Sequence, residues 1–304
     1  MKINLLIFLI LISFIGIGQT KKDTIMLYYL GGQSNMQGYG YNKDLPSHLK
    51  KFENVYIFQG KSVGDNQPDG GIGKWEILKP GNGTDFETNG KLNKLSSRFG
   101  VELSFAKKLQ ELYPNQKIAF IKYSRNGSSL DSLAASNFGS WEPDFKSGKG
   151  INQYDHYLKT IKNALSVSDI NNDGVVDFLK PMGIIWMQGE SDGYNNENVA
   201  KKYYDNLNRL MDLMRASFHD NDLPIVIGKI SDSGRDKDGK VWDYGELVQF
   251  GQEKFIKTHN NTEIVRSTSQ YNYSDQYHYD SLGYIDLGMK FAECVYNLNY
   301  NKNK

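Results

Sequence analysis

The feature that most constrains the fold is a regular alternation of short apolar segments with longer amphipathic ones. Runs rich in apolar or β-branched residues predict buried strands at residues 24–30, 55–58, 118–123, 183–187, 225–230 and 263–266. Apolar residues at helical spacing predict helices at residues 100–112, 154–165, 197–216, 244–258 and 282–298. This alternation is typical of an α/β fold with a parallel sheet. Ligands of such sheets bind beyond the carboxyl ends of the strands, so the residues after each strand are where a site is expected.

The N-terminal residues have the layout of a secretory signal. Lys2 precedes an apolar run over residues 3–17, and the small residue Gly18 indicates cleavage before Gln19. We therefore expect a signal peptide at residues 1–18 and a secreted or periplasmic protein without a stable membrane anchor. An uncleaved anchor is the alternative, but the run is shorter than the roughly 20 apolar residues that a membrane span needs.

The charge of the chain argues against two classes of partner. The formal net charge is +1, and removal of residues 1–18, which contain one lysine and no acidic residue, leaves 1 − 1 = 0. A neutral chain lacks the basic surface that binds nucleic acid or anionic membranes. Residues 19–304 contain no evident linker or repeat, so a single domain is expected. The sole cysteine, Cys294, excludes an intramolecular disulfide.

A serine follows the first predicted strand directly. Gly31 and Gly32 allow the backbone to turn tightly, and the turn places Ser34 at the mouth of the sheet. Ser34 is therefore a candidate nucleophile. The alternative is that Ser34 only caps a following helix, as serine often does. A base within reach would decide between the two.

Five histidines could supply that base: His48, His156, His219, His259 and His278. Only His278 combines a position after a predicted strand with a nearby acid. Asp275 precedes it by three residues, a spacing at which a carboxylate can fold back onto the imidazole and fix its tautomer. A lone exposed histidine in a surface loop is the alternative. The position of His278 just ahead of the last predicted helix favours the catalytic interpretation.

Ser191 competes with Ser34. Residues 189–193 match the G-x-S-x-G elbow of α/β-hydrolases and follow the strand predicted at residues 183–187. That elbow requires a helix immediately after the serine, whereas the next predicted helix begins near Glu197. Ser191 is therefore the weaker candidate. The sequence contains no H-E-x-x-H or Cys/His ligand set, so it gives no support to a zinc hydrolase.

Four segments together carry a family resemblance. They are GQSNM at residues 32–36, FGVE at 99–102, WMQGESD at 186–192 and DQYH at 275–278, in that order. With them the chain resembles the sialate O-acetylesterases and the acetylxylan esterases of carbohydrate esterase family 6, in the SGNH hydrolase group. The resemblance implies a three-layer α/β/α sandwich with a mainly parallel, flavodoxin-like sheet. It also implies a serine esterase that removes acetyl groups from carbohydrates.

The resemblance assigns roles to five residues. It implies Ser34 as nucleophile, His278 as general base and acid, and Asp275 as the orienting carboxylate. The oxyanion hole would combine the backbone amides of Ser34 and Gly100 with the side-chain amide of Gln188. For Gln188, a core hydrogen bond to a backbone carbonyl is the alternative.

At some positions the sequence departs from the family pattern or allows more than one assignment. In some members of the family the glutamate at the position of Glu190 has been proposed as the triad acid, although the short spacing to His278 favours Asp275. Val101 stands where proline is common, and Met187 where histidine is common. Residues 123–128 lack the usual Gly-Gly-Thr, which leaves the acyl and sugar specificity open. The implied chemistry requires no metal or organic cofactor.

Two further interpretations concern the substrate and a metal ion. Asn35, Asn126 and Trp141 are expected to contact the substrate. Trp75, Trp141 and Trp242 fall in predicted loops, where an exposed indole could stack on a sugar, and Trp141 is the first choice because it follows the loop after the third predicted strand. A tryptophan in a loop can also be a buried anchor. Asp169, Asn171, Asp173, Gly174 and Asp177 stand at positions 1, 3, 5, 6 and 9 of an EF-hand-like loop. Position 12 is Lys180 and not glutamate, so a plain turn rich in Asp and Asn competes with a structural calcium site.

The sequence therefore predicts an O-acetylesterase acting on acetylated carbohydrates such as xylan, other plant polysaccharides or sialic acids. An esterase of the same fold acting on lipids or aryl esters is the first alternative. A non-catalytic carbohydrate-binding module is the second.

Overall fold

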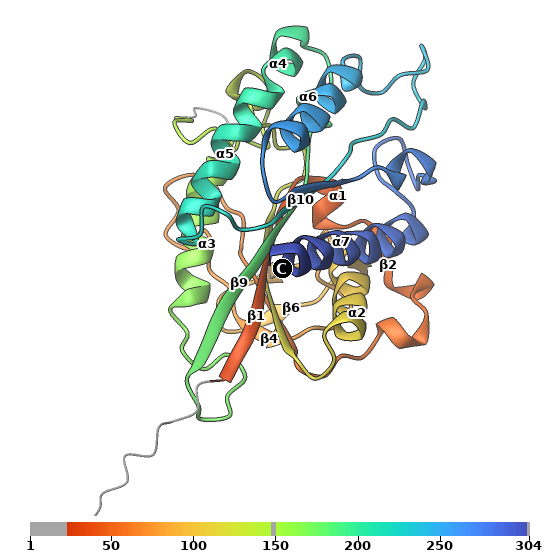
Figure 1. The fold of residues 1–304 in the computed structure, drawn as a ribbon. Coiled ribbons are helices and arrows are strands. Elements are labelled where there is room, and N and C mark those ends of the chain that lie inside the picture. Colours follow the sequence, from red (N-terminus) through yellow and green to blue (C-terminus); the bar gives the residue numbers. More distant parts are fainter. Residues whose placement is uncertain (1–22, 147–149, 303–304) are drawn as a thin grey trace, which may run out of the picture.

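The computed structural model describes residues 23–146 and 150–302, so the expected signal peptide lies outside the described residues. A seven-stranded sheet with the order β11-β10-β9-β1-β8-β3-β4 runs through the molecule (Figure 1). Its strands are β1 (Asp23–Gly32), β3 (Val55–Gln59), β4 (Trp75–Ile77), β8 (Lys117–Ser124), β9 (Asp177–Met187), β10 (Ile225–Gly228) and β11 (Thr262–Val265). All neighbouring pairs are parallel except β3 with β4.

Helices cover both faces of the sheet. They are α1 (Ser34–Gln37), α2 (Glu102–Leu112), α3 (Gln153–Leu165), α4 (Glu197–Lys201), α5 (Tyr203–Ser217), α6 (Gly245–Thr258) and α7 (Ser281–Lys302). Helices α2 and α7 lie on one face, and α3 and α5 lie on the other (Figure 1). The expected three-layer α/β/α arrangement around a mainly parallel sheet is thus confirmed. In a flavodoxin-like sheet the second parallel strand pairs with the first, whereas here β3 pairs with β8.

Smaller elements decorate this framework. The short strands β2 (Gly40–Tyr41) and β7 (Arg98–Phe99) form one two-stranded sheet, and β5 (Glu87–Thr88) and β6 (Asn93–Lys94) form another. Single 3₁₀ turns are η1 (Asn42–Asp44), η2 (Ser47–Leu49), η3 (Ser132–Ala134) and η4 (Ser267–Gln270).

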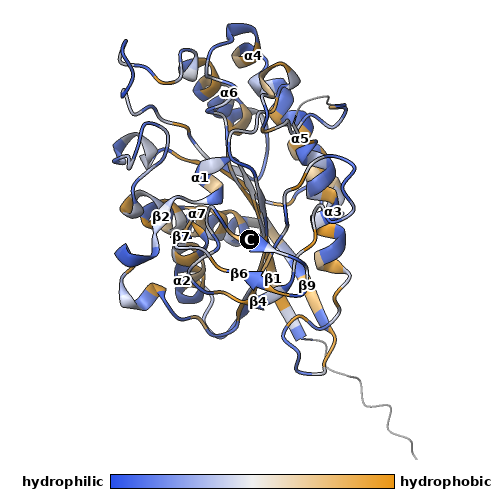
Figure 2. Cartoon of the chain, turned by 180° about the vertical axis from the view of Figure 1, so that it is seen from behind, coloured by the Kyte–Doolittle hydropathy of each residue, from blue (hydrophilic) through white to orange (hydrophobic). Residues whose placement is uncertain are grey.

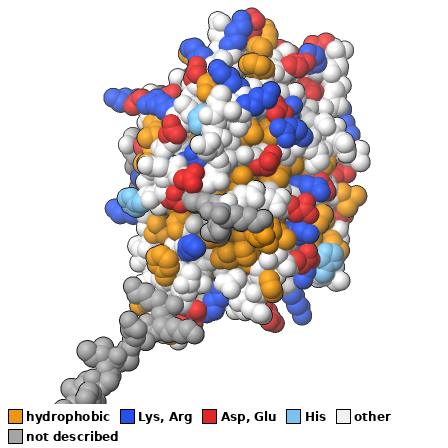
Figure 3. Space-filling view, in the orientation of Figure 1, with side chains coloured by type: hydrophobic (Ala, Val, Ile, Leu, Met, Phe, Trp, Pro, Cys, Tyr) orange, Lys and Arg blue, Asp and Glu red, His pale blue; other side chains and the backbone are white. Residues whose placement is uncertain are grey.

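The core follows from the apolar strands. Strands of a parallel sheet are buried on both faces, so they consist of continuous apolar runs, as in residues 25–30 of β1. Figure 2 shows these apolar strands inside the helical layers. In the orientation of Figure 1, acidic and basic side chains are interspersed on the surface (Figure 3). None of the helices in the described ranges combines the length and apolar character needed to cross a membrane.

Strand β9 begins earlier than the apolar run at residues 183–187 predicts. Its first half pairs only with β1, because β10 joins it at Ile184 and beyond. Pro181, which has no backbone N–H to donate, therefore lies where one side of β9 has no strand neighbour. A register shift against β1 between Leu27 and Tyr28 lies at the same point.

Candidate functional site

The turn after β1 fixes the position of Ser34. Gly32 has φ of 143°, and a Cβ at this residue would lie 1.9 Å from the carbonyl oxygen of Met187, so only glycine fits. The next amide, that of Gln33, donates to the same oxygen at 2.9 Å. Helix α1 begins directly at Ser34, beyond the carboxyl end of β1. The N-cap of α1 is Gln33, without a side-chain cap, so Ser34 is not the helix cap that formed its alternative interpretation.

His278 is held by the expected acid. The carboxylate of Asp275 accepts the backbone amides of Tyr277 and His278, at 2.7 and 2.8 Å, and thereby folds the loop back on itself. Its other oxygen lies 2.8 Å from Nδ1 of His278. The spacing of three residues is thus the spacing that lets one carboxylate hold both the loop and the ring. This bond leaves Nε2 as the imidazole nitrogen that faces other partners.

Tyr39 contributes a feature that has no signal in the sequence. Its ring stacks on the imidazole of His278 with centroids 3.5 Å apart and planes 4° from parallel. Burial lowers the pKa of His278 below its ordinary value, although Asp275 acts in the opposite direction. Burial raises the pKa of Asp275, but hydrogen bonds from His278 and from the loop amides outweigh it and leave this pKa low. The pair therefore favours a neutral imidazole beside an ionised carboxylate.

Ser34 and His278 line one cavity of about 600 Å³. One wall comes from the loop after β8 and includes Asn126, Leu133 and Phe138. An aromatic cluster of Tyr194, Trp242 and Tyr277 also lines the cavity. The cavity therefore opens beyond the carboxyl ends of β1 and β8, as the parallel fold predicts.

Ser191 also lines this cavity. However, residues 190–193 form a turn, and the next helix, α4, begins only at Glu197. Ser191 thus lacks the strand, tight turn and immediate helix of a nucleophile elbow. Ser34, which is followed by α1, has that arrangement.

The structure corrects the expected role of Gln188. Its side chain is completely buried, and its amide donates to the carboxylate of Asp192 at 2.6 Å and to the carbonyl of Ser128 at 3.2 Å. Its side-chain oxygen accepts from the hydroxyl of Tyr203 at 3.1 Å. Both amide hydrogens are thus used inside the protein, which matches the alternative of a core hydrogen bond. Gln188 therefore has no free donor for an oxyanion.

Gly100 is engaged in the same way. Its backbone amide donates to the carboxylate of Glu102 at 2.9 Å. Glu102 in turn forms a fully buried ion pair with Lys122, whose ammonium also donates to the carbonyls of Gln37 and Asn82. Of the three expected oxyanion donors, only the Ser34 amide is unengaged, because the first N–H groups of a helix have no carbonyl partner within it.

Glu190, the alternative triad acid, is not the carboxylate hydrogen-bonded to His278. It is buried, and one of its oxygens accepts from the amide of Asn35 at 2.8 Å. The other oxygen has no hydrogen-bond partner among the described residues. Burial raises the pKa of Glu190 to about 7.

Asn35 is a connector and not an exposed contact for substrate. Besides Glu190, its amide donates to the carbonyl of Tyr277 at 3.3 Å. Its side-chain oxygen accepts from the amide of Tyr279 at 3.4 Å and from the hydroxyl of Tyr284 at 2.7 Å. One buried side chain thus joins α1, which carries Ser34, to the loop that carries His278. The expectation that Asn35 contacts substrate is contradicted by this burial.

The tryptophan that lines the cavity is also not the one expected first. Trp141 is 1% exposed, donates from its indole to Ser128 at 2.9 Å and packs edge-on against Trp186, so it belongs to the core. Trp242, from the loop before α6, lines the cavity instead. Asn126 lines the cavity as expected, and its backbone amide is fixed by the side chain of Gln37 at 2.9 Å.

The loop with EF-hand-like spacing closes on itself. Asp169 accepts the amides of Asp173 and Gly174, and Asn171 also accepts the amide of Asp173, at distances of 2.9 to 3.2 Å. Asp177 accepts the amide of Ile170 at 2.7 Å. These bonds form a turn rich in Asp and Asn, the interpretation that Lys180 at position 12 favours over a calcium site. Across residues 23–146 and 150–302, no group of three or more His, Cys, Asp or Glu side chains could hold a metal ion.

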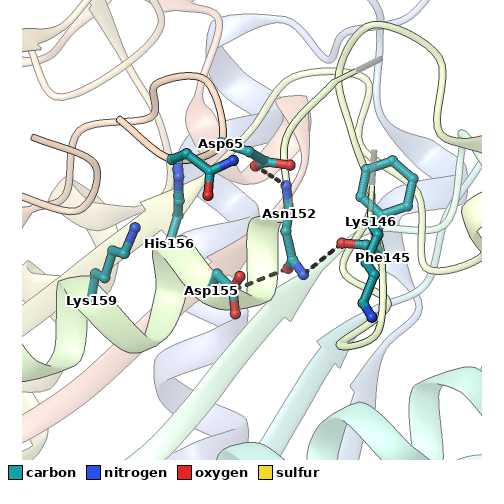
Figure 4. A pocket seen from close by; sticks show the side chains of 8 residues that line it. Asp65, Phe145, Lys146, Asn152, Asp155, His156 and Lys159 are labelled. Atoms are coloured by element: carbon teal, nitrogen blue, oxygen red, sulfur yellow. Dashed lines mark hydrogen bonds between the residues drawn. The ribbon is translucent and has the colours of Figure 1, made fainter. Parts of the chain in front are cut away.

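A second hollow of about 350 Å³ lies between the loop after β3 and helix α3 (Figure 4). Its lining includes Asp65, Asn152 and His156. Both ring nitrogens of His156 are buried without a hydrogen-bond partner among the described residues, and burial lowers its pKa to about 4. Neither Ser34 nor His278 lines this hollow, so His156 is not placed to serve Ser34 as a base.

Comparison with solved structures shows the same fold. A protein from Arabidopsis thaliana superposes with a TM-score of 0.62 at 19% identity, covering 90% of this chain and 98% of that one. A carbohydrate acetylesterase from Xanthomonas citri gives 0.60 at 17% identity, covering 90% of this chain and 57% of that one. NanS gives 0.56 at 16% identity, covering 93% and 99%.

The family comparison matches nearly the whole described chain. Comparison with curated proteins finds no match. The model of the family described as carbohydrate esterase, sialic acid-specific acetylesterase, matches residues 24–297. These residues include the turn at Ser34, the cavity walls and the Asp275–His278 pair. The chain therefore belongs to this carbohydrate esterase family and is a carboxylic ester hydrolase.

Proposed function

We propose that this protein is a secreted or periplasmic serine esterase that removes acetyl groups from hydroxyls of carbohydrates. The observation that carries the proposal is the shared cavity, which is lined both by a serine on a tight strand-to-helix turn and by a histidine already held by a carboxylate. This combination is the nucleophile, base and orienting acid that acyl transfer needs.

The chemistry proceeds through an acetyl-serine intermediate. Nε2 of His278 takes the proton of Ser34 while Oγ attacks the acetyl carbon, and the carbonyl oxygen becomes an oxyanion. As the tetrahedral intermediate collapses, the C–O bond to the sugar breaks, and the imidazolium returns the proton to the leaving sugar oxygen. Water then gives a proton to His278 and attacks the acetyl-serine. As the second tetrahedral intermediate collapses, the bond from the acetyl carbon to Oγ breaks, the imidazolium of His278 returns its proton to Oγ of Ser34, and acetate is released.

The aromatic cluster supports a carbohydrate as the leaving group. Trp242 packs against Tyr194 and Tyr277 with ring centroids 6.1 and 5.7 Å apart. Tyr194 and Tyr277 are 45% and 39% exposed. Rings with an apolar face and a polar edge suit the alternating CH and OH groups of a sugar. We place the sugar against this cluster and the acetyl group beside Ser34 and Asn126.

Two apolar side chains from the loop after β8 favour the alternative of a lipid or aryl esterase. Leu133 is 71% exposed and Phe138 is 37% exposed, and both line the cavity. Such apolar side chains could hold a longer acyl chain or an aryl group.

Acetate release from a panel of substrates tests the proposal. We expect turnover of acetylated xylan, pectic polymers or O-acetylated sialic acids, and a steep loss of kcat/KM from acetyl to butyryl and octanoyl esters of one alcohol. Rising activity with chain length would favour the lipid esterase. A complete lack of turnover, together with no labelling by a serine-directed fluorophosphonate, would leave a non-catalytic carbohydrate-binding module.

The pH dependence follows from the pKa of His278. The base must be neutral to accept the proton of Ser34, so activity falls as the pH drops through this pKa. Because burial holds it below the ordinary value, the acidic limb of kcat/KM should have its midpoint below about 6.5. A pH–rate profile measures this midpoint, and Glu190→Gln serves as the control because Glu190 also titrates in this range. A midpoint above 7 that Glu190→Gln leaves in place would contradict the assignment.

A further inference from the structure

One face of the imidazole of His278 is covered by the ring of Tyr39. The two ring centroids lie 3.5 Å apart and the planes are 4° from parallel, so the rings lie face to face. Neutral aromatic pairs avoid this arrangement and prefer offset or edge-on contacts with centroids about 4.5–7 Å apart. A cation, in contrast, is attracted to the electron-rich face of an aromatic ring at such short distances. The stack therefore suits the imidazolium form of His278 better than the neutral imidazole.

The backbone around Tyr39 holds its ring in this place. The preceding residue, Gly38, has φ of 101°, and a Cβ there would lie 2.3 Å from Cα of Gly100, so only glycine fits. The carbonyl of Tyr39 accepts a hydrogen bond from the guanidinium of Arg98. The strand β2, which follows Tyr39 directly, pairs with β7. The stack is thus fixed by contacts that do not involve His278.

The stack and the carboxylate act on His278 from different directions. Asp275 meets the edge of the ring at Nδ1, whereas Tyr39 covers a face and obstructs neither nitrogen, because hydrogen bonds lie in the ring plane. Tyr277 contacts the ring edge-on, with centroids 6.1 Å apart. Asp275 favours the imidazolium, whereas burial and the guanidinium of Arg98 oppose it. Tyr39 does not line the cavity, so its effect on the reaction must pass through His278.

We propose that Tyr39 is a positioning residue that stabilises the imidazolium of His278 through the face of its ring and thereby promotes the transfer of the Ser34 proton to Nε2. The inference rests on the proposed acetyl transfer at Ser34. His278 is positively charged only between the uptake and the return of that proton, so the stack contributes most at the tetrahedral intermediates and their flanking transition states. Interactions made mainly there raise kcat and leave KM little changed. Tyr39 itself exchanges no proton and forms no covalent bond.

Stepwise fluorination of the ring tests the electrostatic part of this proposal. Tyr39→Phe keeps the stack, and difluoro-, trifluoro- and pentafluorophenylalanine at the same position withdraw electrons from the ring face with little change of shape. We expect Tyr39→Phe to keep kcat within about threefold of the wild type, and each fluorination step to lower kcat, by roughly tenfold in total. The KM for an activated acetate ester should stay nearly constant. Equal kcat values for Tyr39→Phe and the pentafluoro variant would overturn the proposal.

The titration of His278 supplies a readout that does not depend on turnover. The pKa of His278, followed by NMR through the ring proton on Cε1, should fall at each fluorination step, because a ring poorer in electrons stabilises the imidazolium less. The midpoint of the acidic limb of kcat/KM should move in the same direction. If Tyr39 only fills space beside His278, neither midpoint moves across the series, and the proposal is overturned. A wild-type protein that hydrolyses no acetate ester would instead refute the proposed function, while the NMR titration would still decide on the stack.

A matched control and a variant without the ring complete the experiment. The same fluorinated residues at Phe250, a 68% exposed ring on α6 that does not line the cavity, should change neither kcat nor the pKa of His278. Tyr39→Leu keeps apolar bulk without an aromatic face, so we expect its kcat and the pKa of its His278 to lie below those of Tyr39→Phe. Melting temperatures of all variants report folding. A folded Tyr39→Leu variant with wild-type kcat would contradict the proposal.

Discussion

Replacement of Ser34 by alanine is expected to lower kcat by about 10⁶ and to abolish labelling by a fluorophosphonate, with the melting temperature nearly unchanged. Loss of a serine nucleophile has an effect of this order because the remaining groups cannot act without it. Folding should be preserved because the Ser34 hydroxyl caps no helix and the turn is made by its neighbours. Rates of acetate release and intact-protein mass after labelling measure the effect.

Ser191→Ala is the matched control in the same cavity. It should keep most of the wild-type activity and all of the labelling, since Ser191 contributes its backbone amide to Gln33 and that amide survives the substitution. Activity that survives in Ser34→Ala and disappears in Ser191→Ala would reverse the assignment of the nucleophile.

Asp275→Asn should produce the second largest loss, roughly 10³-fold in kcat. A buried triad carboxylate is worth about 10⁴ because its loss leaves the histidine in the wrong tautomer. Asp275 is 48% exposed, so water compensates part of that loss, which explains our smaller figure. The asparagine oxygen can still accept the amides of Tyr277 and His278 and keep the loop folded. The kcat of the purified variant on an activated acetate ester measures the effect.

Glu190→Gln is the comparison that decides which acid serves His278. Its side-chain oxygen can still accept from Asn35, and its new amide replaces an oxygen that has no described partner. We therefore expect less than a tenfold loss at neutral pH, because Glu190 is not the carboxylate bonded to His278. A larger loss in Glu190→Gln than in Asp275→Asn would show that Glu190 is the triad acid.

The main strands and helices were predictable because apolar runs and helical periodicity are local features of the sequence. The six predicted parallel strands correspond to β1, β3, β8, β9, β10 and β11. The helix predicted at residues 197–216 is divided into α4 and α5 at Lys202, which periodicity alone does not mark. The antiparallel edge strand β4 and the pairing of β3 with β8 were missed, since both depend on contacts between segments far apart in sequence.

In the site, too, contacts within one short segment were predictable, and contacts between distant segments were not. The Asp275–His278 contact was predictable because both residues belong to one short loop. The hydrogen bonds that engage the amides of Gln188 and Gly100 could not be predicted. They depend on the positions of Asp192, Ser128 and Glu102 in the folded chain. Trp141 was taken for a surface residue because it lies outside a strand or helix, yet irregular segments also pack into cores.

The buried amide of Asn35 has a consequence for when the site can form during synthesis of the chain. Its partners Tyr277 and Tyr284 lie 242 and 249 residues further along the chain. Because a domain folds as a unit, the hydrogen bonds of Asn35 to these two residues form only after residues 277–284 have been synthesised. Hydrolytic activity therefore requires a chain that extends through Tyr284, and a chain that ends before Tyr277 contains the nucleophile but lacks His278, its base.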